Sequence, residues 1–321
     1  MIAWLRRPQV RQRAGTILRW VSIIGTAVAL VWFVRGLDLH HLRAAFARTS
    51  PAPLVVAVGV GIGSHYVRAL GWSVMLGPRY RIPFGRQVRY EFTAQAASAL
   101  MPARAGEMLR VWLLRRDGVP PGTTAALVGV KKLYEGLGLA LLALAAPWLL
   151  PGLPGWLTGT IWVFAAAMAA LTVALVVAGR RIRADAPATR WGRFTAGLTF
   201  LRDMRRVGAA IALAVVGELA DLAAVVAVLY ALDIDVPLIA AAVILFVVDT
   251  SNLFPSAPAH AGTFEVGVLA AFDALGGQTA AAVAFALIFH TQQVVSQIVV
   301  GVPFLLSEML TRRRSLGPAT P

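Results

Sequence analysis

Two long stretches of the chain carry no charged side chain. Neither Gly136 to Gly179 nor Ala274 to Ser307 contains an Asp, Glu, Lys or Arg. A helix needs about 20 apolar residues to cross the hydrocarbon core of a bilayer, so each stretch can hold at least one span. Overall, 58% of residues are hydrophobic and 14% are charged, against about 25% charged in an ordinary soluble domain. The sequence therefore predicts an all-α polytopic membrane protein.

The excess of positive charge has an explanation in the membrane. The formal net charge is +15, which in a soluble protein would suggest a nucleic-acid partner. Here many of the arginines gather before residue 17, within 180–206 and after residue 308. Short loops rich in Lys and Arg stay on the cytoplasmic side. We therefore expect no nucleic-acid partner, and a multi-pass protein of a bacterial inner membrane with both termini and the loop 180–206 in the cytoplasm.

Hydrophobic runs divide the chain into two membrane halves. The expected parts are a basic N-terminus 1–16, a first membrane half 17–179, an Arg-rich loop 180–206, a second membrane half 207–308 and a tail 309–321. Six full spans are expected, at about 17–37, 52–76, 123–149, 156–178, 207–232 and 279–307. The segments 84–116 and 236–276 are short or interrupted by proline, and we expect them to form broken re-entrant hairpins.

Both hairpins contain nearly the same five letters. "PARAG" (102–106) and "PAHAG" (258–262) are 156 residues apart, and so are "TTAALVGV" at Thr123 and "TAAAVAFA" at Thr279. Broken hairpins that enter from opposite faces are typical of an inverted-topology repeat, which is the arrangement we predict. Coincidence in an alanine-rich chain is the alternative. The predicted breaks are Pro102 and Gly106 in the first hairpin and Pro255, Pro258 and Gly262 in the second.

Polar side chains near these breaks are candidates for function, because a charge at the bilayer centre costs about 2.5–3.5 kcal/mol or more. Arg104 and Arg110 are expected to bind an anionic headgroup, since the guanidinium fork matches a phosphate. Glu107, three residues from each, can pair with either arginine and is expected to keep Arg104 oriented and partly neutralised. The candidate substrate-binding residues are Arg104, Glu107, Arg110, Lys131, Lys132, Glu135, Asp249, Asn252, His260, Glu265 and His290.

Structural roles stay open for several of these residues. The alternatives are a clasp within the hairpin for Arg104 and Glu107, a helix cap for Glu265, an interior hydrogen bond for His290 and a place at the membrane interface for Lys131 and Lys132. Glu218 and Asp221, one turn apart on a span, are expected to bond to a neighbouring helix. Arg115 and Arg116 are expected to reach the cytoplasmic headgroups.

Motifs for catalysis are missing from the sequence. It contains no cysteine, no Walker loop and no zinc-ligand spacing. We therefore expect no catalytic residues, no metal site and no cofactor, and we do not expect an enzyme.

Two segments resemble signatures of a known family. "ALMPARAGEMLRVWLL" is similar to the "PaRxGExxR" signature of the lysylphosphatidylglycerol synthase transmembrane region, also called the flippase-like domain family, and "LFPSAPAHAGTFE" resembles its second signature. The resemblance spans about 17–308. It implies a membrane region that moves a lipid between leaflets. Lysyl-lipid synthesis is not implied, because the family's large aminoacyltransferase domain would follow the membrane region and the chain stops at Pro321. Ala259, His260 and the Lys131–Glu135 stretch depart from the family pattern, and they leave the lipid open.

A lipid flippase or transporter is the leading functional hypothesis, with an anionic, glycosylated or hopanoid-type membrane lipid as substrate. One alternative is an accessory subunit that works with partner proteins of lipid biosynthesis. Another is a proton-coupled transporter of a small solute, working through Asp249 or Glu265.

Single-cysteine labelling tests the predicted topology on a clean background, since the chain has no cysteine. A cysteine at Gly192, in the loop 180–206, should resist an impermeant thiol reagent in intact cells and react in inside-out vesicles. Reaction from outside intact cells would place this loop on the wrong face.

Overall fold

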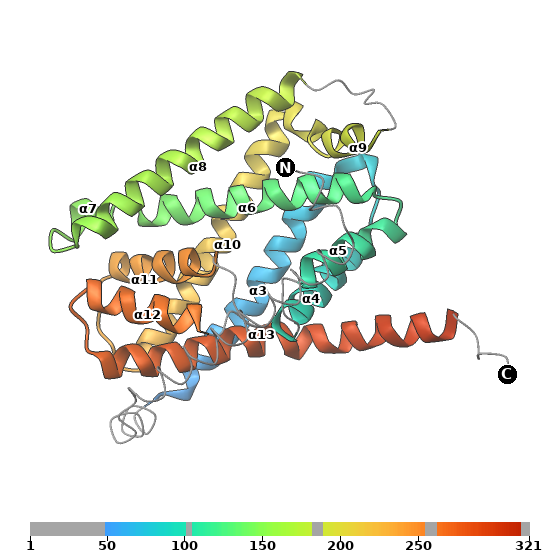
Figure 1. Ribbon diagram of the computed structural model, residues 1–321. Coiled ribbons are helices and arrows are strands. Elements are labelled where there is room, and N and C mark those ends of the chain that lie inside the picture. The colour runs from blue at the N-terminus through green and yellow to red at the C-terminus, as the bar shows by residue number, and fades with distance from the viewer. Residues whose placement is uncertain (1–48, 101–104, 182–188, 254–261, 316–321) are drawn as a thin grey trace, which may run out of the picture.

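The computed structural model describes residues 49–100, 105–181, 189–253 and 262–315, and the regular structure within these ranges is helical (Figure 1). The α-helices are α3 (Pro51–Leu76), α4 (Phe84–Leu100), α5 (Ala105–Arg116), α6 (Pro121–Ala143), α7 (Ala146–Leu149), α8 (Gly155–Arg181), α9 (Arg190–Ala196), α10 (Met204–Ala231), α11 (Leu238–Ser251), α12 (Thr263–Ala274) and α13 (Thr279–Ser315), with short 3-10 helices η2 (Gly77–Arg79) and η3 (Thr199–Arg202). The predicted all-α class is confirmed.

Local sequence explains where the two central helices begin and end. Pro51 occupies the first position of α3, where its missing N–H costs nothing, and Gly77 ends the helix with a φ of 61°. Asp203 begins α10, because its side chain accepts hydrogen bonds from the backbone N–H groups of Arg205 and Arg206. Such caps satisfy donors that a helix start leaves free.

Four described helices are long and apolar enough to cross a membrane, namely Pro51–Arg79, Gly155–Arg181, Met204–Ala231 and Thr279–Glu308. They match four of the six expected spans, and the expected span 17–37 lies outside the described residues. Helix α6, which occupies the expected span 123–149, differs because three charged residues lie in its middle: Lys131, Lys132 and Glu135.

The expected helix 123–149 is also shorter than predicted. Helix α6 ends at Ala143, and the one-turn helix α7 follows from Ala146. Pro147 is the physical reason, because a proline ring clashes with the carbonyl four residues earlier, here that of Ala143, and has no N–H to donate.

Helices α3 and α10 cross the middle of the molecule and run antiparallel (Figure 1). The N–H of Ser50, just before α3, donates to the carbonyl oxygen of Ala231 at the end of α10, at 3.0 Å. At the other end, Gly77 lies against the side chain of Arg206 in the first turn of α10. The start of each helix therefore meets the end of the other.

The helix order repeats with the offset of 156 residues. Adding 156 to the bounds of α3, α4 and α5 gives 207–232, 240–256 and 261–272, against the observed bounds 204–231, 238–251 and 263–274 of α10, α11 and α12. The starts of α6 and α13 correspond in the same way. Helix α4 of the first half packs on α13 of the second, and α11 of the second half packs on α6 of the first. A two-fold relation between the halves requires this exchange of partners. Because the equivalent helices α3 and α10 are antiparallel, the two halves are inverted, as predicted.

Each predicted hairpin consists of two helices rather than one continuous span. In the first, Gly106 of α5 approaches α4 so closely that a Cβ there would fall 2.0 Å from the carbonyl oxygen of Ala94. In the second, Gly262 takes a φ of 90° just before α12, a conformation that favours glycine. Pro102, Arg104, Pro255, Pro258 and His260 lie outside the described residues.

A buried ion pair joins the two helices of the first hairpin. Arg110 Nη2 of α5 donates to Glu91 Oε2 of α4 at 2.6 Å, and both residues are at most 3% exposed. The guanidinium also lies over the ring of Trp72, 4.7 Å from its centroid. Of the two arginines that Glu107 could pair with, Arg110 is thus paired with Glu91 across the hairpin, and Arg104 lies outside the described residues.

The second hairpin packs without such a pair. The described parts of α11 and α12 contain no Lys or Arg, so no ion pair between the two helices can form there. Instead Gly267 of α12 lies against Ser251 and Val248 of α11. The two hairpins thus share their backbone arrangement and differ in what holds them together.

The Arg-rich loop folds back onto the first membrane half. The hydroxyl of Thr123 in α6 donates to the carbonyl oxygen of Arg193 in α9 at 2.8 Å. Gly192 is buried here and Arg193 is exposed, so Arg193 is the better cysteine position for the topology experiment.

Replacing one or both charges tests the role of the ion pair in the first hairpin. Arg110→Met leaves the Glu91 carboxylate buried and unpaired, which should destabilise the protein by about 3–5 kcal/mol. Adding Glu91→Leu removes the second charge and should recover most of the loss, because the second hairpin packs without charges. The measurement is thermal unfolding in detergent, with exposed Arg115→Ala as the unaffected control. A double variant as unstable as Arg110→Met would contradict this account.

Candidate functional site

Arg68 lies inside the membrane-spanning part of α3 and binds carboxylates from two other helices. It is eight residues before the end of α3, about 12 Å along the axis, and its side chain is only 15% exposed. Its guanidinium forms ion pairs with Glu135 of α6 and with Asp221 of α10, and Nη2 lies 3.6 Å from Glu218 Oε1. The guanidinium fork suits such sharing, because its five N–H donors point in fixed directions.

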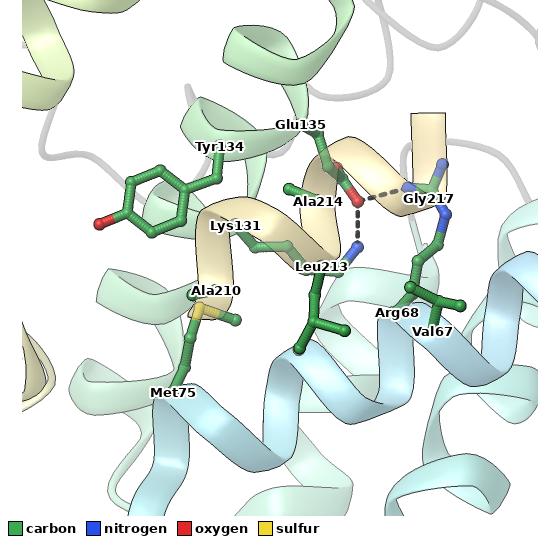
Figure 2. Close-up of a pocket in the computed structure, with 11 residues that line it drawn as sticks. Val67, Arg68, Met75, Lys131, Tyr134, Glu135, Ala210, Leu213, Ala214 and Gly217 are labelled. Carbon is green, nitrogen blue, oxygen red and sulfur yellow. Dashed lines mark hydrogen bonds and ion pairs between the residues drawn. The ribbon is translucent and has the colours of Figure 1, made fainter. Parts of the chain in front are cut away.

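Two lysines of α6 complete the arrangement around Glu135. Lys131 and Lys132 both donate to this carboxylate, Lys132 at 3.0 Å. Figure 2 shows Glu135 between Arg68 and Lys131. Lys131, Lys132 and Glu135 were all predicted as site residues, and the structure brings them together. We call Arg68, Lys131, Lys132, Glu135, Glu218 and Asp221 the Arg68 cluster.

Residues from both hairpins lie near this cluster. Asp249, in the last turn of α11, is close enough to interact electrostatically with Lys132, Asp221 and Glu218. Glu107, in the first turn of α5, interacts with Lys132 in the same way. The end of α11 and the start of α5, which border the breaks of the two hairpins, therefore both lie near α6.

The charges of this region do not cancel. Together, the Arg68 cluster and Asp249 contain three cations and four carboxylates, which leaves one negative charge in excess if all are ionised. Asp249 forms no ion pair with any residue in the described ranges, whereas the other three carboxylates lie within 4 Å of Arg68. Burying an uncompensated charge is costly, and Asp249 is the carboxylate of these four that has no cation within 4 Å in the described ranges.

A narrow cavity of about 30 Å³ lies beside the cluster, between α3, α6 and α10. That volume suits one or two water molecules and is far too small for a lipid headgroup. The cavity is mainly apolar away from Arg68, Lys131 and Glu135. The residues that line it are Val67, Arg68, Gly71, Met75, Lys131, Tyr134, Glu135, Ala210, Leu213, Ala214 and Gly217. Figure 2 labels all of them except Gly71. Any larger solute needs these helices to separate.

The structure places Glu265 and His290 in a separate arrangement. Glu265 Oε2 accepts from the N–H of Gly262 at 2.6 Å, and Oε1 lies 2.7 Å from His290 Nδ1. One carboxylate oxygen of Glu265 thus caps α12 and the other ties α12 to α13. These are the helix cap and the interior hydrogen bond given above as the structural alternatives for Glu265 and His290. Within the described ranges, no hydrogen bond or ion pair joins them to the Arg68 cluster.

Other predicted residues have varied surroundings. Asn252 ends α11, and its buried Oδ1 has no hydrogen-bond partner among the described residues. Arg116, whose expected place at the headgroups stays a prediction, is 45% exposed and forms an ion pair with Glu308 of α13 at 2.5 Å. Glu218 and Asp221 do bond to a neighbouring helix, as predicted, through Arg68.

Arg68 and Glu91 were missing from the predicted site. Arg68 had a visible signal, because a charge within an otherwise apolar span is a functional candidate by default. His65, one turn before it, is also buried and packs edge-on against Phe92, with the two ring centroids 5.3 Å apart. Glu91 lies seven residues after the start of α4, in a segment whose polar composition hid its burial.

The family model described as the lysylphosphatidylglycerol synthase TM region matches residues 19–301. A comparison with curated proteins found no match.

Substitution of Arg68 tests the charge balance of the cluster. Arg68→Gln raises the excess negative charge from one to two and should destabilise the protein by about 3–5 kcal/mol. Adding Asp221→Asn returns the excess to one and should recover at least half of that loss. The readout is the fraction that stays monodisperse on size exclusion after heating in detergent. If Asp221→Asn gives no recovery, charge balance is not what Arg68 supplies.

Proposed function

We propose that this chain, which belongs to the lysylphosphatidylglycerol synthase TM-region family, is a lipid flippase or lipid transporter of a bacterial inner membrane. The substrate would be an anionic, glycosylated or hopanoid-type lipid, and both termini would lie in the cytoplasm. Its headgroup would pass the Arg68 cluster while the acyl chains stay in the bilayer.

The observation that carries this proposal is the depth of the charges. Asp221 lies 17 residues after the start of α10 and ten before its end, so at least about 15 Å of helix separates it from either terminus. Charges this far inside a hydrocarbon core about 30 Å thick are expensive. A polar path is the function that such a cost most often serves in a membrane protein.

The inverted repeat supports the same proposal. In transporters with inverted repeats, the substrate site lies near the bilayer midplane, between broken segments of the two halves, and alternating access moves one half against the other. Here the broken hairpins approach α6 from both halves. The cavity beside Arg68, about 30 Å³, is too small for a headgroup, so on this proposal the helices around it separate during transport.

Lys132 is the group best placed to meet a headgroup. Its side chain is 53% exposed, while Lys131, on the same helix, is only 11% exposed. A headgroup phosphate could replace Glu135 as the partner of Lys132, because Glu135 keeps Arg68 and Lys131 as partners.

A second candidate function is proton-coupled transport of a small solute. The excess negative charge at Asp249 favours it, since a carboxylate without an ion pair can take up and release a proton. Asp249→Asn should then abolish dependence on a pH gradient, whereas a lipid flippase that needs no proton should work without such a gradient.

Lipid translocation in proteoliposomes tests the leading proposal. Fluorescent lipids in one leaflet would be followed by dithionite quenching, with wild type and variants at equal protein density. Lys132→Ala should slow translocation about tenfold or more, as expected for the loss of a charge-assisted hydrogen bond, with rates compared at equal amounts of folded, monodisperse protein. Arg115→Ala, exposed at the end of α5, is the matched control. Equal rates for Lys132→Ala and wild type would argue against this path.

A further inference from the structure

A second, larger cavity lies away from the Arg68 cluster, where the Arg-rich loop meets the membrane helices. Its volume is about 330 Å³, at the lower end of the range for small-molecule sites. The residues that line it are Met75, Leu76, Arg79, Tyr80, Thr123, Leu127, Ala196, Gly197, Thr199, Phe200, Arg202, Asp203 and Arg206. They come from the end of α3, η2 and the residue after it, the start of α6, the end of α9, η3 and the start of α10.

The place of this cavity is set by the two central helices. It lies where α3 ends and α10 begins, and both helices are long and apolar enough to cross a membrane. The cavity is therefore at the boundary between bilayer and water, on the side of the Arg-rich loop. A ligand can reach it either from the headgroup layer or from solution.

The charges of the cavity favour an anion. Three arginines and one aspartate line it. Asp203 already caps α10 and pairs with Arg206 Nε at 3.1 Å. Arg79 and Arg202 have no carboxylate partner among the described residues. Two guanidinium groups are thus available to a ligand, with apolar side chains behind them, and Phe200 and Leu76 are at most 6% exposed.

From this geometry we infer that the cavity binds a phosphate ester, held by Arg79 and Arg202, with its non-phosphate part against Leu76, Leu127 and Phe200. Guanidinium groups suit this role because they donate paired hydrogen bonds to phosphate oxygens. The phosphate ester could belong to a lipid headgroup or to a water-soluble molecule. The inference stands whether or not the chain transports lipid, because it uses none of the residues of the Arg68 cluster.

Neighbouring arginines provide matched controls. Arg81 and Arg205 are exposed and lie close in sequence to Arg79 and Arg202, but they do not line the cavity. If arginines on this face attract anions only through diffuse surface charge, all four residues should contribute equally. A built site should depend on the two lining residues.

Binding of two probes to the full chain in neutral detergent tests the inference. The probes are dihexanoyl phosphatidic acid and glycerol 3-phosphate, titrated by calorimetry at constant ionic strength. Arg79→Ala and Arg202→Ala should each raise the Kd about tenfold, as expected for the loss of a charge-assisted hydrogen bond. Arg81→Ala and Arg205→Ala should change it less than twofold. Arg79→Lys and Arg202→Lys, which keep the charge, should still bind at least threefold more weakly than wild type.

The two probes also separate the two sources of phosphate. Tighter binding of the phosphatidic acid, with the same dependence on Arg79 and Arg202, supports a lipid headgroup. Equal binding of both probes supports a water-soluble phosphate ester. The inference is overturned if wild type binds neither probe, or if the Arg81 and Arg205 variants weaken binding as much as the Arg79 and Arg202 variants.

Discussion

The need to pair a guanidinium inside hydrocarbon governs the centre of this protein. Arg68 is held about 12 Å from the end of α3, and the carboxylates that pair with it come from α6 and α10. These ion pairs set the register of the antiparallel helices α3 and α10. Because both hairpins pack against helices held in this way, the cluster is at once a structural joint and the most polar place in the membrane region.

The inverted repeat preserves the backbone plan and not the side-chain chemistry. Helix lengths, breaks and packing partners recur in the two halves. The buried charges do not: Glu91 and Arg110 have no charged counterparts in the second hairpin, and the capping arrangement of Glu265 and His290 belongs to the second half. Functional asymmetry can thus arise within a symmetric scaffold, because hydrophobic packing accepts many side chains of similar volume.

Local sequence patterns predicted the helices and their inverted relation. They did not predict which charged side chains from distant parts of the sequence pair with one another. Uncharged runs mark spans because hydrocarbon excludes charge along any short segment, and the offset of 156 residues followed from the repeated letters. The partners of Arg68 are 67 and 153 residues away in sequence, and no local pattern specifies which carboxylate a given arginine will meet. Pro147, in contrast, was a readable stop signal that the apolar composition around it concealed.

The difference between the hairpins has a mechanical consequence. Separating α4 from α5 would leave the Glu91 carboxylate and the Arg110 guanidinium unpaired in a medium that cannot hydrate them. The contact between these two helices is therefore stiff. Helices α11 and α12 meet through Gly267, Ser251 and Val248, and a small slide there breaks no ionic contact. If the two halves are pushed apart, the second hairpin therefore deforms more easily, and the first hairpin moves as a rigid unit.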